Sequence, residues 1–320
     1  MARVLNIGSL NIDNVYQVPH FVRGGETLAA YRRARHVGGK GLNQSVALAR
    51  AGLEVLHAGR IGTDGEFLKE FLRKEGVDVN RVEVDDAEAS GHCFIQISPE
   101  GENSILYYPG TNVRLTKDFI REAIRTLNRG EALLIQNETN GVKDTIRYGL
   151  ERNLRIIFNP SPYDSSVPLQ PLDDLAAVIM NETELEGILD LSKRDRTDDQ
   201  YLELIAELGS RYPNTALLVT LGSRGCAVRY PGCIPVVIPA FKVHAVDTTG
   251  AGDTFTGFAV RALIEAWEAE DEEVPLDRIY EKLLTGIRFA QMAAAISVTR
   301  AGAAQSIPKW VEVDAALARL

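Results

Sequence analysis

Cysteine is scarce in this chain of 320 residues, which contains only three. Cys93, Cys226 and Cys233 form no CxxC pair, and no cluster of histidines accompanies them in the sequence. An odd number of scattered cysteines favours neither a disulfide framework nor a structural zinc site. Such cysteine usage is typical of proteins in a reducing cytosol.

Positive charge and long apolar runs are also in short supply. Lysine and arginine number 35 against 44 acidic residues, and the net charge of -9 repels polyanions such as nucleic acids. No apolar stretch reaches the roughly 18 residues of a membrane-spanning helix. Gly8, Asn11 and Asp13 interrupt the N-terminal segment too early for a signal-peptide core. We therefore expect a soluble, cytoplasmic protein with no nucleic-acid or membrane partner.

Short apolar runs alternate with helical patterns along most of the chain. A length of 320 residues suits either two domains or one large α/β domain. The alternation predicts a doubly wound, mostly parallel sheet with helices on both faces. The runs that predict buried strands are 4–7, 55–58, 133–136, 156–158, 176–179 and 217–220.

Two segments interrupt this alternation. Residues 14–37 show no helical period, and residues 89–109 read as two strands around a turn at 98–102. If the two segments pair, they would form a small β-sheet lid over an α/β core made of residues 1–13, 38–88 and 110–320. The alternative is a pair of unrelated edge hairpins, and the periodicity does not decide between them.

The sequence DTTGAGDTFTG at residues 247–257 precedes an apolar helical pattern. Glycines at a helix start leave the first backbone N–H groups free to face an anion, and the helix dipole favours negative charge there. Asp253 is an unusual companion for a bound phosphate unless it accepts a proton beside that phosphate. The alternative is a helix whose first turn carries an acidic residue for dipole reasons alone.

The sequence GGKGLNQ at residues 38–44 opens another predicted helix. It is not a Walker A loop, because glycine follows Lys40 where that motif requires Ser or Thr. It offers close backbone approach, one cation and two amides, which suits neighbouring hydroxyls of a polyol. The alternative is that the glycines only allow the backbone conformation at the start of the helix and that the polar residues are exposed to solvent.

Further polar residues follow predicted strands at their carboxyl ends, where open α/β sheets bind ligands. Asn11 and Asp13 follow the first strand, as hydroxyl-binding groups or as an Asx turn. Glu184, in the sequence NETE at 181–184, would hold a hydrated Mg²⁺ or complete a capping box. The glycine-containing turn at 220–225 would either bind a nucleotide or only reverse the direction of the chain. The convergence of all these loops on one sheet edge favours the functional interpretations.

Taken together, these motifs resemble the ribokinase family of sugar kinases. Residues 38–52 and 247–257 are similar to the two signatures of that family, in the same order and spacing. The second signature is the more specific. Matching segments at 9–13, 101–103, 181–184, 220–225 and 299–302 extend the resemblance over nearly the whole chain.

The resemblance implies an α/β core with a β lid, and ATP-dependent phosphorylation of a sugar's primary hydroxyl. It makes Asp253 the general base, and it makes the amides of Gly250, Ala251 and Gly252 the anion hole. The implied sugar-binding residues are Asn11, Asp13, Gly39, Lys40, Asn43, Glu138, Cys93 and Tyr107. The implied nucleotide-binding residues are Asn181, Thr220, Leu221, Gly222, Ser223, Arg224, Gly225, Gly252 and Gln291. Glu184 would hold Mg²⁺, and an activating K⁺ would lie among Asp247, Thr249, Ser297, Arg300, Gly302 and Ser306.

The lid departs from the family pattern, in which the face over the sugar is small or aliphatic. Here it carries Cys93 and Tyr107, with His92 and Tyr108 beside them. A tyrosine there narrows the pocket, reads a substrate hydroxyl or stacks on a base. Ribose is the leading substrate, while fructose, a keto-deoxy sugar acid or a nucleoside stays open. A homodimer through the unpaired lid edges is expected.

Two other classes of protein fit the sequence less well than a kinase. A dinucleotide-dependent oxidoreductase requires its glycine fingerprint after an early strand, whereas here the glycine signature lies near residue 250. A non-catalytic sugar sensor would most simply lack the base, and Asp253 is present.

Overall fold

A large twisted sheet forms the centre of the molecule. The computed structural model describes residues 3–167 and 171–320, so residues 1–2 and 168–170 of the predicted core lie outside it. Within this part the sheet has nine strands in the order β13-β12-β11-β10-β9-β8-β1-β4-β5. Its strands are β1 (Arg3–Ile7), β4 (Glu54–Gly62), β5 (Asp78–Asp85), β8 (Ala132–Gln136), β9 (Arg155–Asn159), β10 (Ala177–Asn181), β11 (Ala216–Thr220), β12 (Gly225–Arg229) and β13 (Val236–Pro239).

The sheet is parallel from β5 to β11, and only β12 and β13 run antiparallel to their neighbours. This confirms the predicted doubly wound, mostly parallel sheet. The chain moves outward from β1 in both directions, so the topological switch point lies between β1 and β8. Ligands of such sheets bind at the carboxyl ends of the strands near that point.

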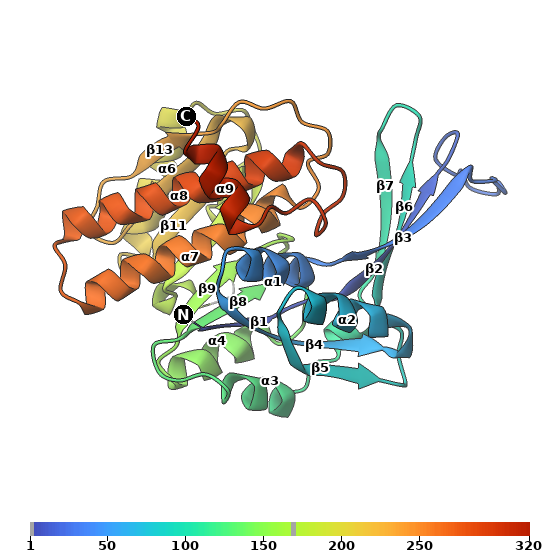
Figure 1. Ribbon diagram of the computed structural model, residues 1–320, viewed down its shortest axis with the longest axis horizontal. Coiled ribbons are helices and arrows are strands. Elements are labelled where there is room, and N and C mark those ends of the chain that lie inside the picture. Colours follow the sequence, from blue (N-terminus) through green and yellow to red (C-terminus); the bar gives the residue numbers. More distant parts are fainter. Residues whose placement is uncertain (1–2, 168–170) are drawn as a thin grey trace.

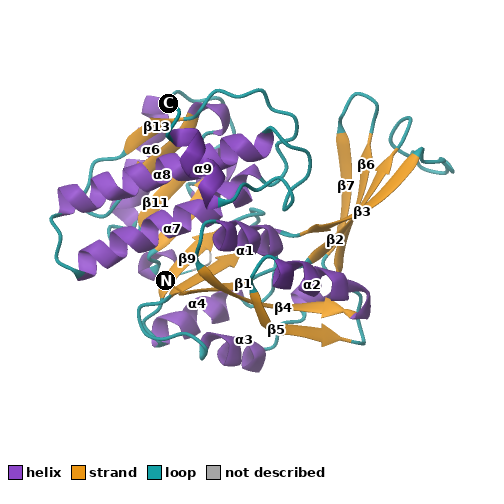
Figure 2. Cartoon of the chain, in the orientation of Figure 1, coloured by secondary structure: helices purple, strands orange, loops and turns teal. Residues whose placement is uncertain are grey.

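Helices cover both faces of this sheet (Figure 2). The helices are α1 (Lys40–Arg50), α2 (Glu66–Lys74), α3 (Lys117–Ile124), α4 (Val142–Glu151), α5 (Glu182–Ile188), α6 (Asp198–Arg211), α7 (Ala251–Asp271), α8 (Leu276–Val298) and α9 (Trp310–Leu317). Buried side chains of α1, α2, α7, α8 and α9 form one apolar core with one face of the sheet. Those of α3 to α6 form a second core on the other face. Alternate strand residues supply the two cores, since Val4 packs into the first and Leu5 into the second.

The two segments that interrupt the α/β alternation form a single four-stranded sheet, the lid. Its strands are β2 (Asn11–Gln17), β3 (Arg32–Gly38), β6 (Gly91–Ile97) and β7 (Asn103–Tyr108), in the order β3-β2-β6-β7. The interpretation as unrelated edge hairpins is therefore wrong. β2 and β6 pair in parallel, and the other pairs are antiparallel. The lid projects from one side of the core (Figure 1), and β2 begins at Asn11, inside the segment expected to belong to the core.

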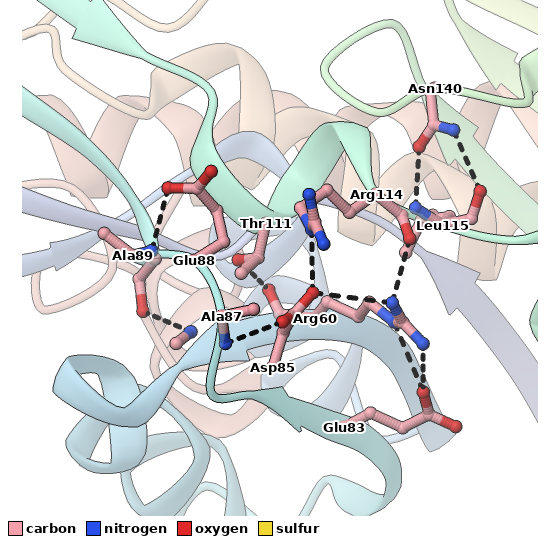
Figure 3. A network of polar contacts seen from close by, with 12 residues as sticks. Arg60, Glu83, Asp85, Ala87, Glu88, Ala89, Thr111, Arg114, Leu115 and Asn140 are labelled. Carbon is pink, nitrogen blue, oxygen red and sulfur yellow. Dashed lines mark hydrogen bonds and ion pairs between the residues drawn. The ribbon is translucent and has the colours of Figure 1, made fainter.

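A charged network ties the base of the lid to the core (Figure 3). Asp85, at the end of β5, accepts a hydrogen bond from Arg114 Nε over 2.8 Å. Arg60 of β4 lies 3.6 Å from the same carboxylate and pairs with Glu83. The hydrogen bond from Arg114 lowers the pKa of Asp85. The two segments that connect the core with β6 and β7 are thus attached to neighbouring points of the central sheet.

Of the helices in the described part of the chain, none combines the length and apolarity that a bilayer crossing needs.

Candidate active site

A small cavity of about 130 Å³ lies at the carboxyl ends of the central strands. Residues from four of the predicted loops line it, and Gly252 and Thr220 also line a second, larger cavity beside it. The sequence-predicted residues in its wall are Lys40, Asn181, Glu184, Thr220, Gly250, Gly252 and Asp253. Loops far apart in the sequence therefore meet at one edge of the sheet, as expected for parallel strands.

The start of α7 forms the suspected anion hole. Gly250 precedes the helix with φ of 76°, a backbone conformation that favours glycine. The N–H of Ala251 donates to the carbonyl of Thr248 over 3.2 Å. The N–H groups of Gly252 and Asp253 belong to the first turn, where a helix supplies no acceptor, so they are available to an anion. A Cβ atom at Gly252 would meet open space, which leaves room for a ligand.

Asp253 is buried, with 8% of its surface exposed, and its side chain does not cap the helix. Asn43 Nδ2 donates to its Oδ2 over 3.0 Å, and Gln44 Nε2 donates to its Oδ1 over 2.9 Å. The carboxylate is thus fixed by two amides from the start of α1. Its place in the cavity wall fits a group that accepts a proton, and the interpretation as a residue present for dipole reasons alone does not explain these contacts.

Glu138 lies at the topological switch point. It follows β8, and it accepts hydrogen bonds from Ser9 Oγ over 2.5 Å and from the backbone N–H of Lys40 over 2.9 Å. Burial raises the pKa of the Glu138 carboxyl, although Lys40 and Ser9 act in the opposite direction. Burial by itself lowers the pKa of Lys40, but the carboxylates of Asp253, Glu138 and Glu184 outweigh this and raise it. Lys40 is therefore held as a cation among three acidic groups.

The lid contributes a second group of predicted residues. Asp13 of β2, Cys93 of β6 and Tyr107 of β7 are neighbours in register, so their side chains lie on one face of the lid sheet. Burial raises the pKa of Asp13 to about 6, with the charge of Glu138 adding to the effect. Burial likewise raises the pKa of Cys93 to about 12, and the charges of Asp13 and Glu138 contribute. This face of the lid and Glu138 therefore share one environment.

Asn11, Tyr107 and Gly39 lie near the base of the lid. Asn11 is buried in β2, not in an Asx turn, and it accepts a hydrogen bond from Asn112 Nδ2 over 2.7 Å. Tyr107 keeps 40% of its surface exposed. Burial raises its pKa to about 12, with Glu138 as the next cause and opposing hydrogen bonds to Asn112 and Asn11. Gly39 precedes α1 with φ of 92°.

The larger cavity, of about 420 Å³, lies between the turn after β11 and helices α7 and α8. The sequence-predicted residues that line it are Thr220, Gly222, Ser223, Gly225, Ala251, Gly252 and Gln291. The sequence analysis missed the remaining walls, which are the loop at 240–245 together with Thr248, Phe255, Ala294, Ala295 and Val298. Mostly apolar walls with a few polar groups suit a planar heterocycle.

Three predicted nucleotide-binding residues do not line this cavity, and one of them, Asn181, lines the small cavity instead. Leu221 is buried in the core on the α3 to α6 face. Arg224 pairs with Glu182 and Asp198, and its guanidinium lies over the Tyr201 ring. The sequence places Leu221 and Arg224 within the glycine turn, but it does not indicate that their side chains point away from the cavity.

Glu184 both caps a helix and lines the small cavity. With Asn181 it forms the capping box of α5, in which its Oε2 accepts from the Asn181 N–H over 2.9 Å. Its carboxylate also borders the small cavity with Asp253 and Lys40. The described residues contain no group of three or more acidic, histidine or cysteine side chains around a metal position. A single carboxylate fits Mg²⁺ that keeps most of its waters.

The loop before α7 brings part of the predicted cation site together. Asp247 Oδ1 accepts from the Thr249 N–H and its Oδ2 from the Gly302 N–H, both over 2.9 Å. Burial alone would raise the pKa of Asp247, but these hydrogen bonds outweigh it and lower the pKa. Ser297 and Ser306 are buried, and their hydroxyls donate to the backbone carbonyls of Ala294 and Ala303. The Arg300 side chain turns to Glu312, so only its backbone is left for an ion.

The structure also adds polar residues that the sequence analysis did not assign. Ser9 contacts Glu138, Asn112 contacts Asn11, and Asn159 lies in the wall of the small cavity. Ser9 and Asn159 stand at or just after the carboxyl ends of predicted strands, which was the available signal. Asn112 follows the lid and carried no signal in the sequence.

Comparisons with known proteins agree with this geometry. The model of the pfkB family of carbohydrate kinases matches residues 1–310. A ribokinase of Haemophilus influenzae is 35% identical over 307 residues, covering 94% of each chain. The crystal structure of a Cryptococcus neoformans ribokinase in complex with ADP is 32% identical over the full length of both chains, with a TM-score of 0.82. The structure of Arabidopsis thaliana ribokinase complexed with ribose and ATP is 26% identical, with a TM-score of 0.83 and coverage of 99% and 98%.

The chain therefore belongs to the pfkB family of carbohydrate kinases. It has the ribokinase-like fold, and it is a phosphotransferase that acts on a sugar hydroxyl.

Proposed function

We propose that the protein is an ATP-dependent ribokinase that converts D-ribose to ribose 5-phosphate. The observation that carries the proposal is the position of Asp253, which lines the small cavity next to Gly252, a residue that lines both cavities. A sugar held between core and lid would place its hydroxyl beside Lys40 and Asp253 in the wall of the small cavity, and ATP in the larger cavity would bring its γ-phosphoryl group to the same helix turn. Relatives named ribokinase support the choice of ribose.

In this proposal Asp253 accepts the proton of the primary hydroxyl as that oxygen bonds to the γ-phosphorus. The bond between the γ-phosphorus and the β,γ-bridging oxygen breaks, and ADP leaves. The amides of Gly250 and Gly252 at the start of α7 stabilise the negative charge on the transferring group, whereas the N–H of Ala251, also expected there, is held by the Thr248 carbonyl. Lys40 supplies a fixed positive charge beside it. Mg²⁺, when bound near Glu184, neutralises part of the charge of the ATP phosphates.

The sugar would lie between core and lid. We assign its binding to Asn11, Asp13, Gly39, Lys40, Asn43, Glu138, Cys93 and Tyr107. Asn43 supports this assignment, because its Oδ1 is buried without a partner among the described residues while its Nδ2 is held by Asp253. A sugar hydroxyl would satisfy that oxygen. The division of the chain into an α/β core and a lid of residues 14–37 and 89–109 belongs to the same proposal.

The nucleotide would lie in the larger cavity, against the turn from Thr220 to Gly225, Gly252 and Gln291, and would reach Asn181 in the adjoining small cavity. We further propose that K⁺ activates the enzyme from the loop that joins Asp247 and Thr249 to Ser297, Arg300, Gly302 and Ser306. The carboxylate of Asp247 supports this proposal, because it lies just before α7 and is held by two backbone N–H groups. A cation bound there would fix the loop that leads into the anion hole. The three free thiols support a cytoplasmic location.

The lid supports a proposal of a homodimer. Val15, Ile95 and Ile105 are neighbours in register on the face that also carries Asp13 and Tyr107. Ile105 is 54% exposed, and apolar side chains in such a row favour burial against a second copy.

Release of ADP with a panel of ribose, fructose, a keto-deoxy sugar acid and nucleosides, with and without K⁺, tests the proposal. We expect the highest kcat/KM with ribose and a loss of rate without K⁺. Asp253→Asn should lose nearly all turnover while it still binds ATP in calorimetry. Near-normal turnover in that variant would overturn the assignment of the base, and preference for a nucleoside would overturn ribose.

A further inference from the structure

A chain of four buried amides runs beneath the small cavity and ends at Asp253. Its members are Asn6 of β1, Gln136 of β8, Gln44 of α1 and Asn159 of β9, and each is at least nine-tenths buried. Gln136 Nε2 donates to Asn6 Oδ1 over 2.9 Å and to Gln44 Oε1 over 2.8 Å. Gln44 Nε2 donates to Asn159 Oδ1 and to Asp253 Oδ1, both over 2.9 Å. The four amides thus form one continuous hydrogen-bonded chain.

Two backbone carbonyls determine which way every amide in this chain points. Asn6 Nδ2 donates to the carbonyl of Gly41 over 2.8 Å, and Asn159 Nδ2 donates to the carbonyl of Ile179 over 2.8 Å. A carbonyl only accepts, so each asparagine must turn its NH₂ group to that carbonyl and its oxygen to the chain. Asn6 therefore offers an oxygen to Gln136, and Asn159 offers an oxygen to Gln44.

The orientation of the Gln44 amide is determined by its neighbours at both ends of the chain of amides. Gln136 meets the Asn6 oxygen with its NH₂ group, so the same group faces Gln44 and requires an oxygen there. The other side of Gln44 must then present N–H groups, one to Asn159 and one to Asp253. Reversing Gln44 would bring its oxygen against the Asp253 carboxylate and against the Asn159 oxygen. At a buried site, each of these contacts would leave acceptors facing acceptors.

We infer that Gln44 is a positioning residue that orients the Asp253 carboxylate for proton transfer, and that Gln136 sets the orientation of Gln44. The inference rests on the proposed role of Asp253 as the base. With Oδ1 held by Gln44 and Oδ2 by Asn43, the carboxylate has one fixed rotation about its Cβ–Cγ bond. A general base requires such a fixed geometry, because a displacement of about 1 Å costs on the order of 10²-fold in rate.

Two variants of the chain test this inference. Gln44→Met keeps the length and burial of the side chain but removes the donor to Asp253. We expect kcat to fall by roughly 10- to 100-fold, with the KM for ATP changed by less than about threefold. Gln136→Leu leaves Gln44 without its orienting donor, and we expect a smaller fall in kcat, on the order of 10-fold. Because Gln136 acts through Gln44, the double variant should be no slower than Gln44→Met alone.

Ser45→Ala is the matched control. Ser45 is the next residue of α1, equally buried, and it accepts from Asn6 and contacts His57 without reaching Asp253. We expect this variant to lower the melting temperature and to keep kcat within about twofold. Melting temperature and ATP binding, measured for every variant, separate a loss of positioning from a loss of fold.

The outcomes distinguish this inference from the proposed function. If Asp253→Asn retains turnover, the assignment of the base fails and the inference fails with it. If Asp253→Asn is inactive while folded Gln44→Met keeps the wild-type kcat, only the inference fails. Additive losses in the double variant would show that Gln136 does not act through Gln44, and an equal loss of kcat in Ser45→Ala would show a general effect of the buried network.

Discussion

The backbone N–H of Lys40 donates to Glu138 Oε2 over 2.9 Å, and so joins the first turn of α1 to the loop after β8. The two residues belong to different arms of the doubly wound sheet. Their hydrogen bond crosses the switch point, where the proposed sugar site lies. The carboxylate of Glu138 therefore organises the start of α1, and in the proposed site it would also face the substrate.

Replacing Glu138 should weaken sugar binding. In Glu138→Gln the Lys40 N–H keeps an acceptor, but the charged acceptor for substrate hydroxyls is lost. Hydrogen bonds to charged groups contribute about 1.5–3 kcal/mol, so we expect the KM for ribose to rise by roughly 10-fold or more. Steady-state kinetics with each substrate varied will show whether the KM for ATP stays within about threefold. Glu122→Gln, an exposed residue of α3, is the control and should change neither constant.

Asp13→Asn should stabilise the fold at high pH while it weakens sugar binding. The pKa of Asp13 is raised to about 6, so between its ordinary value and pH 6 the folded protein holds a proton that the unfolded chain has released. The contribution of Asp13 to stability thus falls as pH rises through this window. Asparagine removes that loss, and we expect a melting temperature higher by about 1–3 °C at pH 8.

Melting curves at several pH values check this sign. The difference between Asp13→Asn and the wild type should shrink as pH falls from 7 to 4. A wild type that is more stable than the variant at pH 8 would contradict the cost assigned to the buried charge.

Tyr107 should limit the size of the acceptor. Its ring stands beside Cys93 in register and faces the same environment as Glu138. Tyr107→Ala opens that space, and we expect the kcat/KM of a hexose or nucleoside to rise about 10-fold relative to ribose. Tyr108→Ala is the matched control, because Tyr108 is adjacent, points to the other face and contacts Glu88. An unchanged selectivity ratio in Tyr107→Ala would remove Tyr107 from the determinants of specificity.

Gln291 should favour adenine over guanine. Its Nε2 donates to the carbonyl of Ile238 over 2.7 Å, so its Oε1 is turned away as a buried acceptor without a partner among the described residues. The amino group of adenine would satisfy this oxygen, whereas the carbonyl of guanine would not. We expect Gln291→Leu to raise the KM for ATP roughly 10-fold and to reduce the preference for ATP over GTP. Met292→Leu, a buried neighbour that does not line the cavity, should leave both unchanged.

Ile105→Lys should produce a monomer if the lids pair. A lysine in the apolar row would bury a charge at the proposed interface, which is costly without a partner. Light scattering at micromolar concentration measures the mass of each form. Ser104→Lys, one residue away on the opposite face, should remain dimeric. A monomeric wild type at that concentration would exclude this dimer.

The parts that the sequence predicted share one physical cause. Strands buried on both faces appear as short apolar runs, and their carboxyl ends must meet at one edge of a parallel sheet. Asp253, Lys40 and Glu184 were therefore found from loops that follow or face such runs, and the structure brings them together. Three strands at the margins, β5, β12 and β13, were not predicted, because they are less buried or lie outside the α/β alternation.

The features that the sequence did not predict depend on the direction in which individual side chains point. Arg224 lies in a glycine turn that borders the nucleotide cavity, yet its side chain turns to Glu182. Gln44 and Gln136 occupy ordinary positions in a helix and a strand, and only the folded structure shows that they meet. Periodicity shows which residues are buried, but it does not show which buried polar groups face one another.

The proposed site is divided between two sheets, so the sugar that accepts the phosphoryl group would also join the lid to the core. Asp13, Cys93 and Tyr107 belong to the lid, while Glu138, Lys40 and Asp253 belong to the core. In the proposed enzyme, a sugar that contacts both sets would act as a non-covalent cross-link, and its binding energy would hold the lid over the phosphoryl donor. A water molecule is too small to span the two sheets. The geometry proposed to select a sugar would therefore also protect ATP from wasteful hydrolysis when no sugar is bound.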